Sequence, residues 1–197
     1  MSDIPLHILA VVASQNKNSV TRVVIQRLAG RLRDGRCEVD VFDYLNETLH
    51  LFNPETSYDA PAFAPLQARV KQADVFLLGT PDYHGSMSSA LKSFLDHFWE
   101  EFAGKLFATA VSSHEKGLTV TDQIRTVARQ CYAWSMPYGV SFAEGTDVAE
   151  GKIVNAKFEE RLEMFARDIR VYGALLAAQR GKDLAGREPG FMARHRT

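Results

Sequence analysis

Short apolar runs alternate with longer segments of helical period along most of the chain, and this alternation limits the possible folds more than any other feature. The apolar runs cover residues 7–13, 37–43, 74–80, 105–111 and 138–142. Segments in which apolar residues recur every three or four positions cover residues 19–32, 65–72, 86–102, 118–134 and 155–178. Such alternation is typical of βαβ units and a parallel sheet. We therefore predict an α/β fold of three layers, a doubly wound sheet of five parallel strands with helices on both faces.

The remaining stretches predict a long connection and a tail. Residues 45–65 contain scattered turn formers and no clean period. Beyond Gly181, glycine, arginine and proline replace most of the large apolar residues. The length of 197 residues suits one domain. We expect that domain to cover residues 1–180, followed by a C-terminal tail, 181–197, that is mobile or reaches a partner subunit.

Charge and composition argue against several classes of partner. The formal net charge of −1 lacks the basic excess of a nucleic-acid-binding domain. The apolar run Leu6–Ala13 is too short to span a bilayer and follows no basic leader, so we expect no membrane partner and a cytoplasmic location. Cys37 and Cys131 have no metal or redox spacing and predict inert, reduced thiols. The six histidines show no metal-ligand spacing, so no metal site is predicted.

Three polar loops follow three of the predicted strands, at 14–21, 81–86 and 112–117. In a doubly wound sheet of strand order 2-1-3-4-5, these loops would follow the neighbouring strands 1, 3 and 4. Ligands of such sheets bind outside the carboxyl ends of the strands, near the point where the strand order reverses. We therefore expect the three loops to meet at one crevice.

The first loop has the chemistry of an anion site. Ser14 and Thr21 supply hydroxyls, short amides lie between them, and a helix is predicted to begin near Ser19. The free N–H groups and the positive dipole of a helix start favour an anion. A capped helix in a polar turn explains the loop equally well. A Gly-Lys-Ser/Thr sequence and a G-x-G-x-x-G fingerprint are both missing, which favours a phosphate group over a nucleoside triphosphate.

The second loop suits a flat ring with polar edges. Pro81 fixes its own φ angle, and Asp82, Tyr83 and His84 then offer successive backbone groups and an aromatic ring before Gly85. A flat heteroaromatic ligand such as a flavin needs this arrangement. A plain strand-to-helix turn capped by Ser86 is the alternative.

These loops resemble those of a known family. The run Thr80-Pro81-Asp82-Tyr83-His84-Gly85-Ser86, followed by Leu91-Lys92 and Asp96, resembles the T-P-E-Y-N-G-S…L-K-N…D-W motif of the NADPH-dependent FMN reductase family. The first loop resembles the family's G-S-x-R-x-x-S-x-N phosphate loop, with Ser14 and Ser19 at the two serines. The likeness covers about residues 6–142. Asn16 stands where the family has Arg, and Thr21 stands where it has Asn.

The resemblance implies a flavodoxin-like fold, FMN and NAD(P)H as cofactors, and a ping-pong transfer of hydride through bound flavin to a small acceptor. The acceptor would be a flavin, a quinone, an azo compound or a metal oxyanion. It also implies a homodimer, or a tetramer, formed through the wide apolar face of the predicted helix 86–102. Because the cofactor supplies the chemistry, no catalytic residue is assigned. The expected cofactor-binding residues are Ser14, Asn16, Ser19, Val20, Thr21, Pro81, Asp82, Tyr83, His84, Gly85, Ser112 and Gly117.

Two other functions fit the same fold. One is a non-enzymatic FMN-binding electron carrier, and the near-zero net charge together with the wide apolar helix face argues against it. The other is a doubly wound binding module without flavin. Asn16 in place of Arg favours this module, whereas the intact Thr-Pro-x-Tyr-x-Gly-Ser run argues against it.

Overall fold

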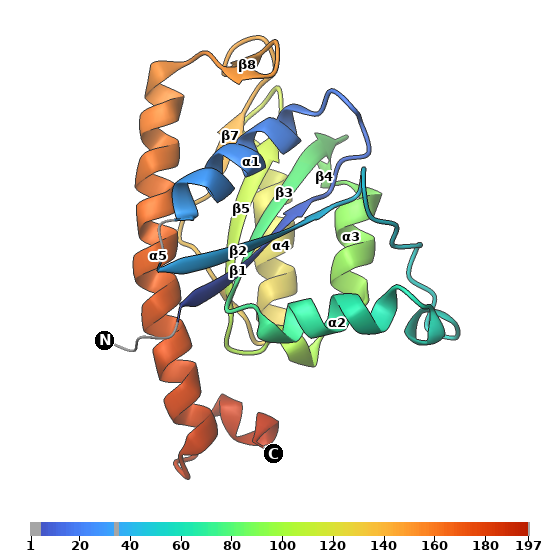
Figure 1. The fold of residues 1–197 in the computed structure, drawn as a ribbon, viewed down its shortest axis with the longest axis vertical. Coiled ribbons are helices and arrows are strands. Elements are labelled where there is room, and N and C mark those ends of the chain that lie inside the picture. Colours follow the sequence, from blue (N-terminus) through green and yellow to red (C-terminus); the bar gives the residue numbers. More distant parts are fainter. Residues whose placement is uncertain (1–4, 34–35, 197) are drawn as a thin grey trace.

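The computed structural model describes residues 5–33 and 36–196, which form a central sheet with helices on both faces (Figure 1). The sheet consists of β1 (Leu6–Val12), β2 (Cys37–Asp43), β3 (Val75–Tyr83), β4 (Ser86–Met87), β5 (Leu106–Ser112), β6 (Trp134–Ser135) and β7 (Val140–Phe142). Its order is β2-β1-β3-β5, and β6 and β7 pair one after the other with the outer side of β5. All these pairs are parallel except β3–β4. The predicted order 2-1-3-4-5 is confirmed, but the sheet has seven strands among the described residues, because the fifth position is divided and β4 is added.

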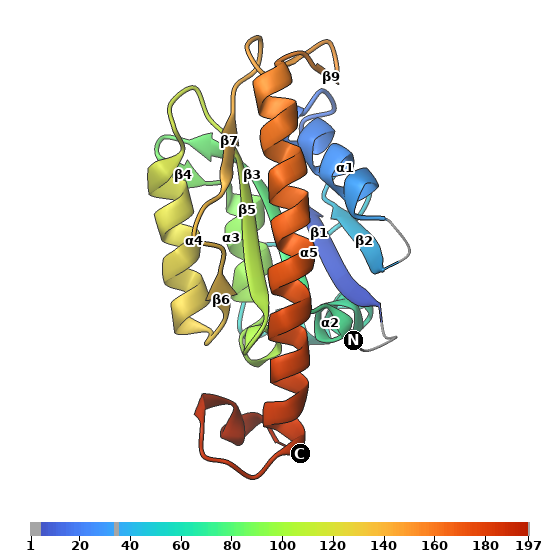
Figure 2. The same ribbon diagram turned by 90° about the vertical axis from the view of Figure 1, so that its left-hand side faces the viewer.

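The helices form two layers, as predicted (Figure 2). One face of the sheet carries α1 (Val20–Leu32) and α5 (Ala156–Ala185). The other face carries α2 (Phe63–Gln72), α3 (Ser89–Asp96) and α4 (Leu118–Gln130). The short 3-10 helices are η1 (Ser57–Asp59), η2 (Glu100–Phe102) and η3 (Phe191–His195). A separate hairpin of β8 (Val148–Ala149) and β9 (Lys152–Ile153) precedes α5.

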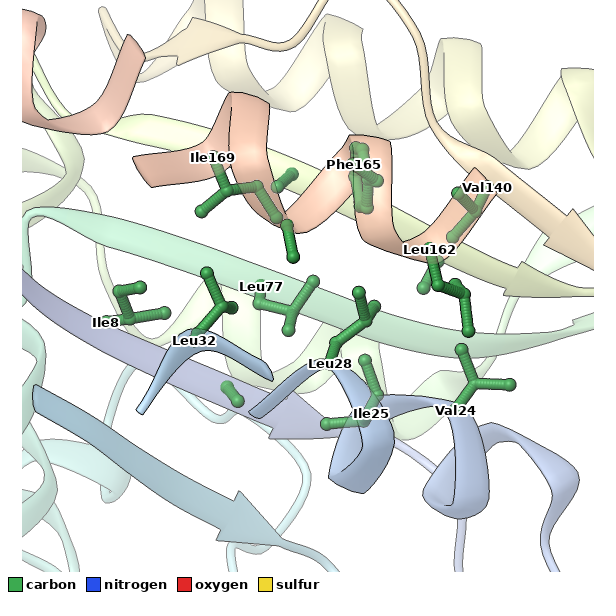
Figure 3. Close-up of a cluster of buried hydrophobic side chains, with 14 of the residues drawn as sticks. Ile8, Val24, Ile25, Leu28, Leu32, Leu77, Val140, Leu162, Phe165 and Ile169 are labelled. Carbon is green, nitrogen blue, oxygen red and sulfur yellow. The ribbon is translucent and has the colours of Figure 1, made fainter. Parts of the chain in front are cut away.

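Alternate residues of the central strands point into two cores. Figure 3 shows the first core, where Leu28 of α1 and Leu162 of α5 meet over Leu77 of β3. The next residue, Leu78, belongs to the second core beneath α2, α3 and α4. Because both faces of the central strands are buried, these strands appear in the sequence as continuous apolar runs.

The predicted helix 86–102 is wrong at both ends. Met87 pairs with Asp82 in a hairpin, so α3 begins only after Ser88, whose Oγ accepts the N–H of Leu91. The helix ends at Asp96, and η2 covers residues 100–102. The apolar side chains Met87, Leu91, Phe94, Leu95, Phe98 and Phe102 are all buried in the second core. The wide apolar face that suggested a dimer contact is therefore buried within the chain's own core. Of its large side chains only Trp99, 57% exposed, lies at the surface.

Two other predicted helices also end at different residues. Helix α4 ends at Gln130 instead of residue 134, since Tyr132 takes a positive φ of 56° and the chain then enters β6. Helix α5 continues to Ala185, past the predicted end at 178. The segment after it folds back, and Met192 is buried. The mobility of residues 181–197 stays a prediction.

Candidate functional site

A cavity of about 180 Å³ opens at the carboxyl ends of β1, β3 and β5. It is lined by Ser14, Asn16, Asn18, Ser19, Val20, Thr21, Pro81, Asp82, Tyr83, Ser112, Ser113, His114 and Glu144. The three predicted loops thus meet at one place. Of the expected cofactor-binding residues, His84, Gly85 and Gly117 do not line this cavity. Asn18, Ser113 and His114 also line it and lie in the predicted loops, although they were not named individually, whereas Glu144 lies outside these loops.

The first loop leads into the start of α1. Ser19 is the N-cap, and its Oγ accepts the N–H of Arg22 at 3.3 Å. The Oδ1 of Asn16 accepts the N–H of Asn18 at 2.9 Å, which closes a tight turn just before the helix. No acidic residue occurs in the first turn of α1. The positive end of the helix dipole therefore faces the cavity without a local negative charge from this turn.

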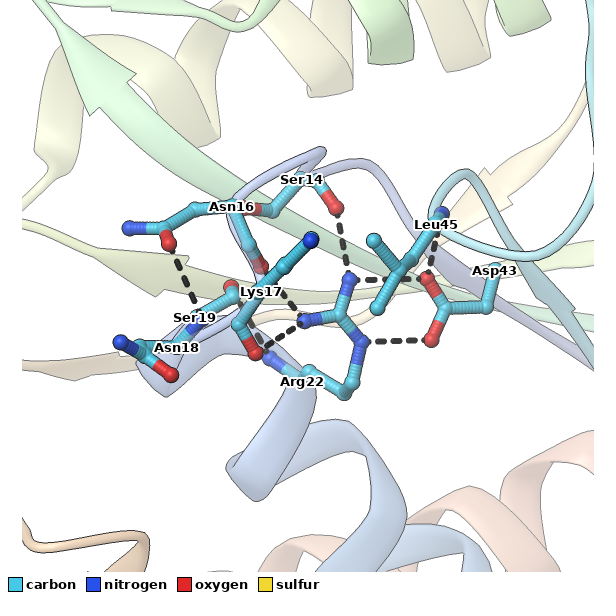
Figure 4. Close-up of polar contacts among 8 residues, drawn as sticks. All are labelled: Ser14, Asn16, Lys17, Asn18, Ser19, Arg22, Asp43 and Leu45. Carbon is cyan, nitrogen blue, oxygen red and sulfur yellow. Dashed lines mark hydrogen bonds and ion pairs between the residues drawn. The ribbon is translucent and has the colours of Figure 1, made fainter.

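Arg22 lies behind this loop and is only 8% exposed. Its guanidinium forms a two-point ion pair with Asp43, through Nε at 2.6 Å and Nη2 at 3.0 Å (Figure 4). Nη2 also donates to the carbonyl of Ser14 at 2.9 Å, and Nη1 donates to those of Asn16 at 2.6 Å and Lys17 at 3.3 Å. The sequence carries no signal for this residue, because no spacing rule connects position 22 with the end of β2.

The second loop is a two-residue β-hairpin turn. Asp82 pairs with Met87 and Tyr83 with Ser86, and both turn residues have positive φ, 57° at His84 and 77° at Gly85. This is the geometry of a type I′ turn, which favours glycine. The strand-to-helix turn capped by Ser86 is therefore wrong. The hairpin leaves Tyr83, 56% exposed, at the wall of the cavity.

Side chains from two other elements hold the hairpin in place. Asp82 accepts the N–H of Gly85 at 2.8 Å and the hydroxyl of Ser113 at 2.9 Å, so each carboxylate oxygen has a protein donor. Gln123 on α4 accepts the N–H of Met87 at 3.2 Å and donates to the carbonyl of Gly85 at 3.3 Å. The second loop is thus connected to the third loop and to α4.

Ser88 joins the first and second loops. Its Oγ donates to the carbonyl of Ala13 at 2.8 Å, and its N–H donates to Thr80 Oγ1 at 3.0 Å. Below this junction, Gly79 lets α1 approach the sheet, since a Cβ at position 79 would lie 2.4 Å from Ile25 Cγ1. The relative position of the two loops therefore depends on a small residue and on a buried hydroxyl.

Gly117 shapes the third loop without lining the cavity. It has a φ of 59° at the start of α4, and a Cβ there would lie 2.9 Å from Val111 Cγ1. Within the described ranges, no group of three or more His, Cys, Asp and Glu side chains could hold a metal ion. None of the described helices is both long enough and apolar enough to cross a membrane.

Comparisons with known proteins agree with this geometry. The model of the NADPH-dependent FMN reductase family matches residues 6–147. An FMN-dependent NADPH-azoreductase from Staphylococcus saprophyticus is 26% identical over 82% of this chain and 92% of its own length. An NADPH azoreductase from a Bacillus species is 32% identical over 75% of this chain and 82% of its own length.

Solved structures show the same fold. The flavoenzyme FerB, an NAD(P)H:acceptor oxidoreductase from Paracoccus denitrificans, has a TM-score of 0.71 at 18% identity, covering 86% of this chain and 98% of its own. The apo form of the NADH:FMN oxidoreductase EmoB has a TM-score of 0.67 at 16% identity, covering 85% and 89%. From its sequence match and its flavodoxin-like fold, the chain belongs to the NADPH-dependent FMN reductase family and is an FMN-dependent NAD(P)H oxidoreductase.

Proposed function

We propose that this protein oxidises NAD(P)H and reduces a small acceptor at the cavity between its three loops, in a ping-pong cycle. The acceptor is a flavin, a quinone, an azo compound or a metal oxyanion. The observation that carries the proposal is the first loop, whose carbonyl groups are turned onto Arg22 while its hydroxyls line the cavity. A phosphate group needs this polarity.

The residues of the cavity fit FMN. Ser14 and Thr21, 5% and 1% exposed, line the cavity, and neither hydroxyl has a hydrogen-bond partner within the described ranges. These hydroxyls, Asn16, and the first N–H groups of α1 at Val20 and Thr21 would hold the phosphate. The backbone of Pro81, Asp82 and Tyr83 would border one side of the ring, and Ser112 would border its polar edge.

Bound FMN would accept the hydride of NAD(P)H and supply electrons to the acceptor. The protein would contribute orientation, and the hairpin is built for this role. Asp82 and Gln123 fix its backbone, and His84 and Gly85 give the turn its shape. Gly117 sets the course of the third loop. Tyr83, exposed at the cavity wall, would border the nicotinamide and the acceptor.

The test begins with the absorption spectrum of the purified protein, with FMN added if the protein is colourless. Anaerobic addition of NADPH and of NADH should then bleach the flavin band. Initial rates with an azo dye, a quinone, free FMN and chromate should give parallel double-reciprocal lines, which are characteristic of a ping-pong cycle. A protein that ignores FMN would contradict the proposal and favour the binding module. Flavin that binds but is not reduced by either nucleotide would favour the electron carrier.

We also propose a homodimer or tetramer in the cytoplasm. Cys37 and Cys131 are both buried thiols, which supports a reducing compartment. Burial of the α3 side chains leaves Trp99 as the exposed apolar side chain of the segment that was expected to form the contact. Light scattering of the wild type and of Trp99→Ser measures the assembly. A monomeric wild type would refute the oligomer, and an unchanged mass for the variant would place the interface elsewhere.

A further inference from the structure

We propose that the buried Arg22–Asp43 pair is the positioning element that gives the first loop its affinity for the FMN phosphate, in place of an arginine at position 16. This inference rests on the proposed function and names the residues responsible for one half of its cofactor site. Arg22 lies behind the loop and does not line the cavity. Its effect must therefore pass through the loop backbone.

The hydrogen bonds of Arg22 show that the guanidinium acts on the loop. Nε and Nη2 bind the two oxygens of Asp43, Nη2 also binds the carbonyl of Ser14, and Nη1 binds two further loop carbonyls. A guanidinium has five N–H donors, and these five contacts account for them. An external anion would find no donor left on this side chain.

The direction of the loop amides follows from these bonds. In a planar trans peptide the C=O of one residue and the N–H of the next point in opposite directions. The carbonyls of Ser14 and Asn16 point at Arg22, so the N–H groups of Gln15 and Lys17 point away from it. Neither N–H has an acceptor within the part of the chain that the structure describes. Arg22 thereby turns these two loop N–H groups away from the guanidinium and leaves them without a protein acceptor.

Two cavity-lining side chains with hydroxyl groups point to a ligand independently of the loop backbone. Ser14 and Thr21 are 5% and 1% exposed, yet both line the cavity. Neither side chain has a hydrogen bond within the described ranges. A phosphate in the cavity would provide acceptors for both.

Asp43 makes the arrangement possible. It lies at the end of β2, is 5% exposed, and holds the guanidinium in one plane through two hydrogen bonds. Its Oδ1 also accepts the N–H of Leu45, which fixes the carboxylate to the turn after β2. A planar two-point pair cannot be reproduced by a lysine, which offers a point charge. The conservative substitution Arg22→Lys should therefore keep the charge and lose the orientation.

The experiment compares ligands that differ only in the phosphate. Dissociation constants of FMN, riboflavin and inorganic phosphate are measured on the flavin-free full chain of the wild type, Arg22→Lys and Asp43→Asn. We expect both variants to bind FMN at least about tenfold more weakly, with riboflavin binding unchanged, since a lost charge-assisted hydrogen bond is worth about that factor. The control is Arg27→Lys, on the same helix but in an exposed ion pair with Glu159, which should bind all three ligands as the wild type does.

A second variant separates positioning from general damage to the fold. Asn16→Arg introduces the family's arginine at the loop itself and should restore FMN affinity to Arg22→Lys, with no effect on riboflavin. Equal losses for FMN and riboflavin, or no loss for either, would overturn the inference. A wild type that binds no flavin but binds phosphate in an Arg22-dependent way would refute the proposed function and leave the role of Arg22 standing.

Discussion

Two buried cations lie at opposite ends of the sheet and hold backbone carbonyls in different ways. Arg22, at the carboxyl end, binds three loop carbonyls and the carboxylate of Asp43. Lys105, just before β5 at the amino end, is 2% exposed and donates to the carbonyls of Val70 and Lys71 at 2.8 Å each. It thereby caps the last turn of α2, where the helix dipole favours a cation.

The two cations differ in whether a carboxylate balances the buried positive charge. Arg22 has a carboxylate at 2.6 Å, whereas Lys105 makes no ion pair within the described part of the chain. Burial is the main cause that lowers the pKa of Lys105 to about 7, and the nearby Arg180 lowers it further, while Asp74 and Glu101 act in the opposite direction. A guanidinium held in place by a carboxylate can define the shape of a binding loop. An unpaired ammonium can give up its proton and still donate its two hydrogen bonds.

The largest expected effect comes from removing the carboxylate that pairs with Arg22. Asp43→Ala would leave a buried guanidinium without its carboxylate, and breaking a buried pair in this way costs about 3–5 kcal/mol of unfolding free energy. Urea unfolding measures this loss. The corresponding change in an exposed pair, Asp96→Ala beside Lys92 on α3, should cost less than about 1 kcal/mol. Similar losses in both variants would show that the Asp43 pair is not special.

The next effect is a dependence of stability on pH that Lys105 should cause. Between its folded pKa of about 7 and its ordinary value of 10.5, the unfolded chain binds a proton that the folded chain does not. The free energy of unfolding should therefore rise with pH in this window, by up to about 1.4 kcal/mol per pH unit. Lys105→Met removes this titration. The difference in unfolding free energy between wild type and variant, measured at pH 7.5 and 9.5, should change by about 2–3 kcal/mol.

An unchanged difference over that interval would mean that Lys105 keeps its proton in the folded protein. Arg180 provides a second check, because it lies close to Lys105 and its own pKa is lowered, chiefly by burial. Arg180→Met should move the folded pKa of Lys105 upward, since the neighbouring positive charge is lost.

The smallest effect concerns Asp74, which raises the pKa of Lys105 from a distance. Asp74→Asn removes that charge and can keep an oxygen for the N–H of His7, now bonded at 3.1 Å. The start of the pH window should shift to lower pH, with a change in unfolding free energy below about 1 kcal/mol at pH 7. A shift to higher pH would contradict the sign of this interaction. The losses of unfolding free energy in Asp74→Asn and Asp43→Ala together compare a distant charge with a charge pair in direct contact.

Local features of the sequence predicted much of the fold and part of the site. The run 37–43 was predicted as a strand and is β2 with the same bounds, because its pattern is visible within seven residues. Ser19 was predicted to cap α1 and does so, because a cap acts on the next few residues. The prediction of one helix over residues 86–102 is wrong because Met87 pairs with Asp82 across a turn. Its apolar period also continues through η2, so it does not mark where the helix ends.

The sequence alone determined the alternation of strands and helices and the family, since both depend on patterns within short segments. It also showed which three loops would meet. The tertiary structure alone decided how the loops are held. Arg22 and Asp43 are 21 residues apart in the chain, and Asp82 and Ser113 are 31 apart. Such contacts have no local signature, because a side chain's partner in a buried hydrogen bond is chosen by where the strands and helices place it.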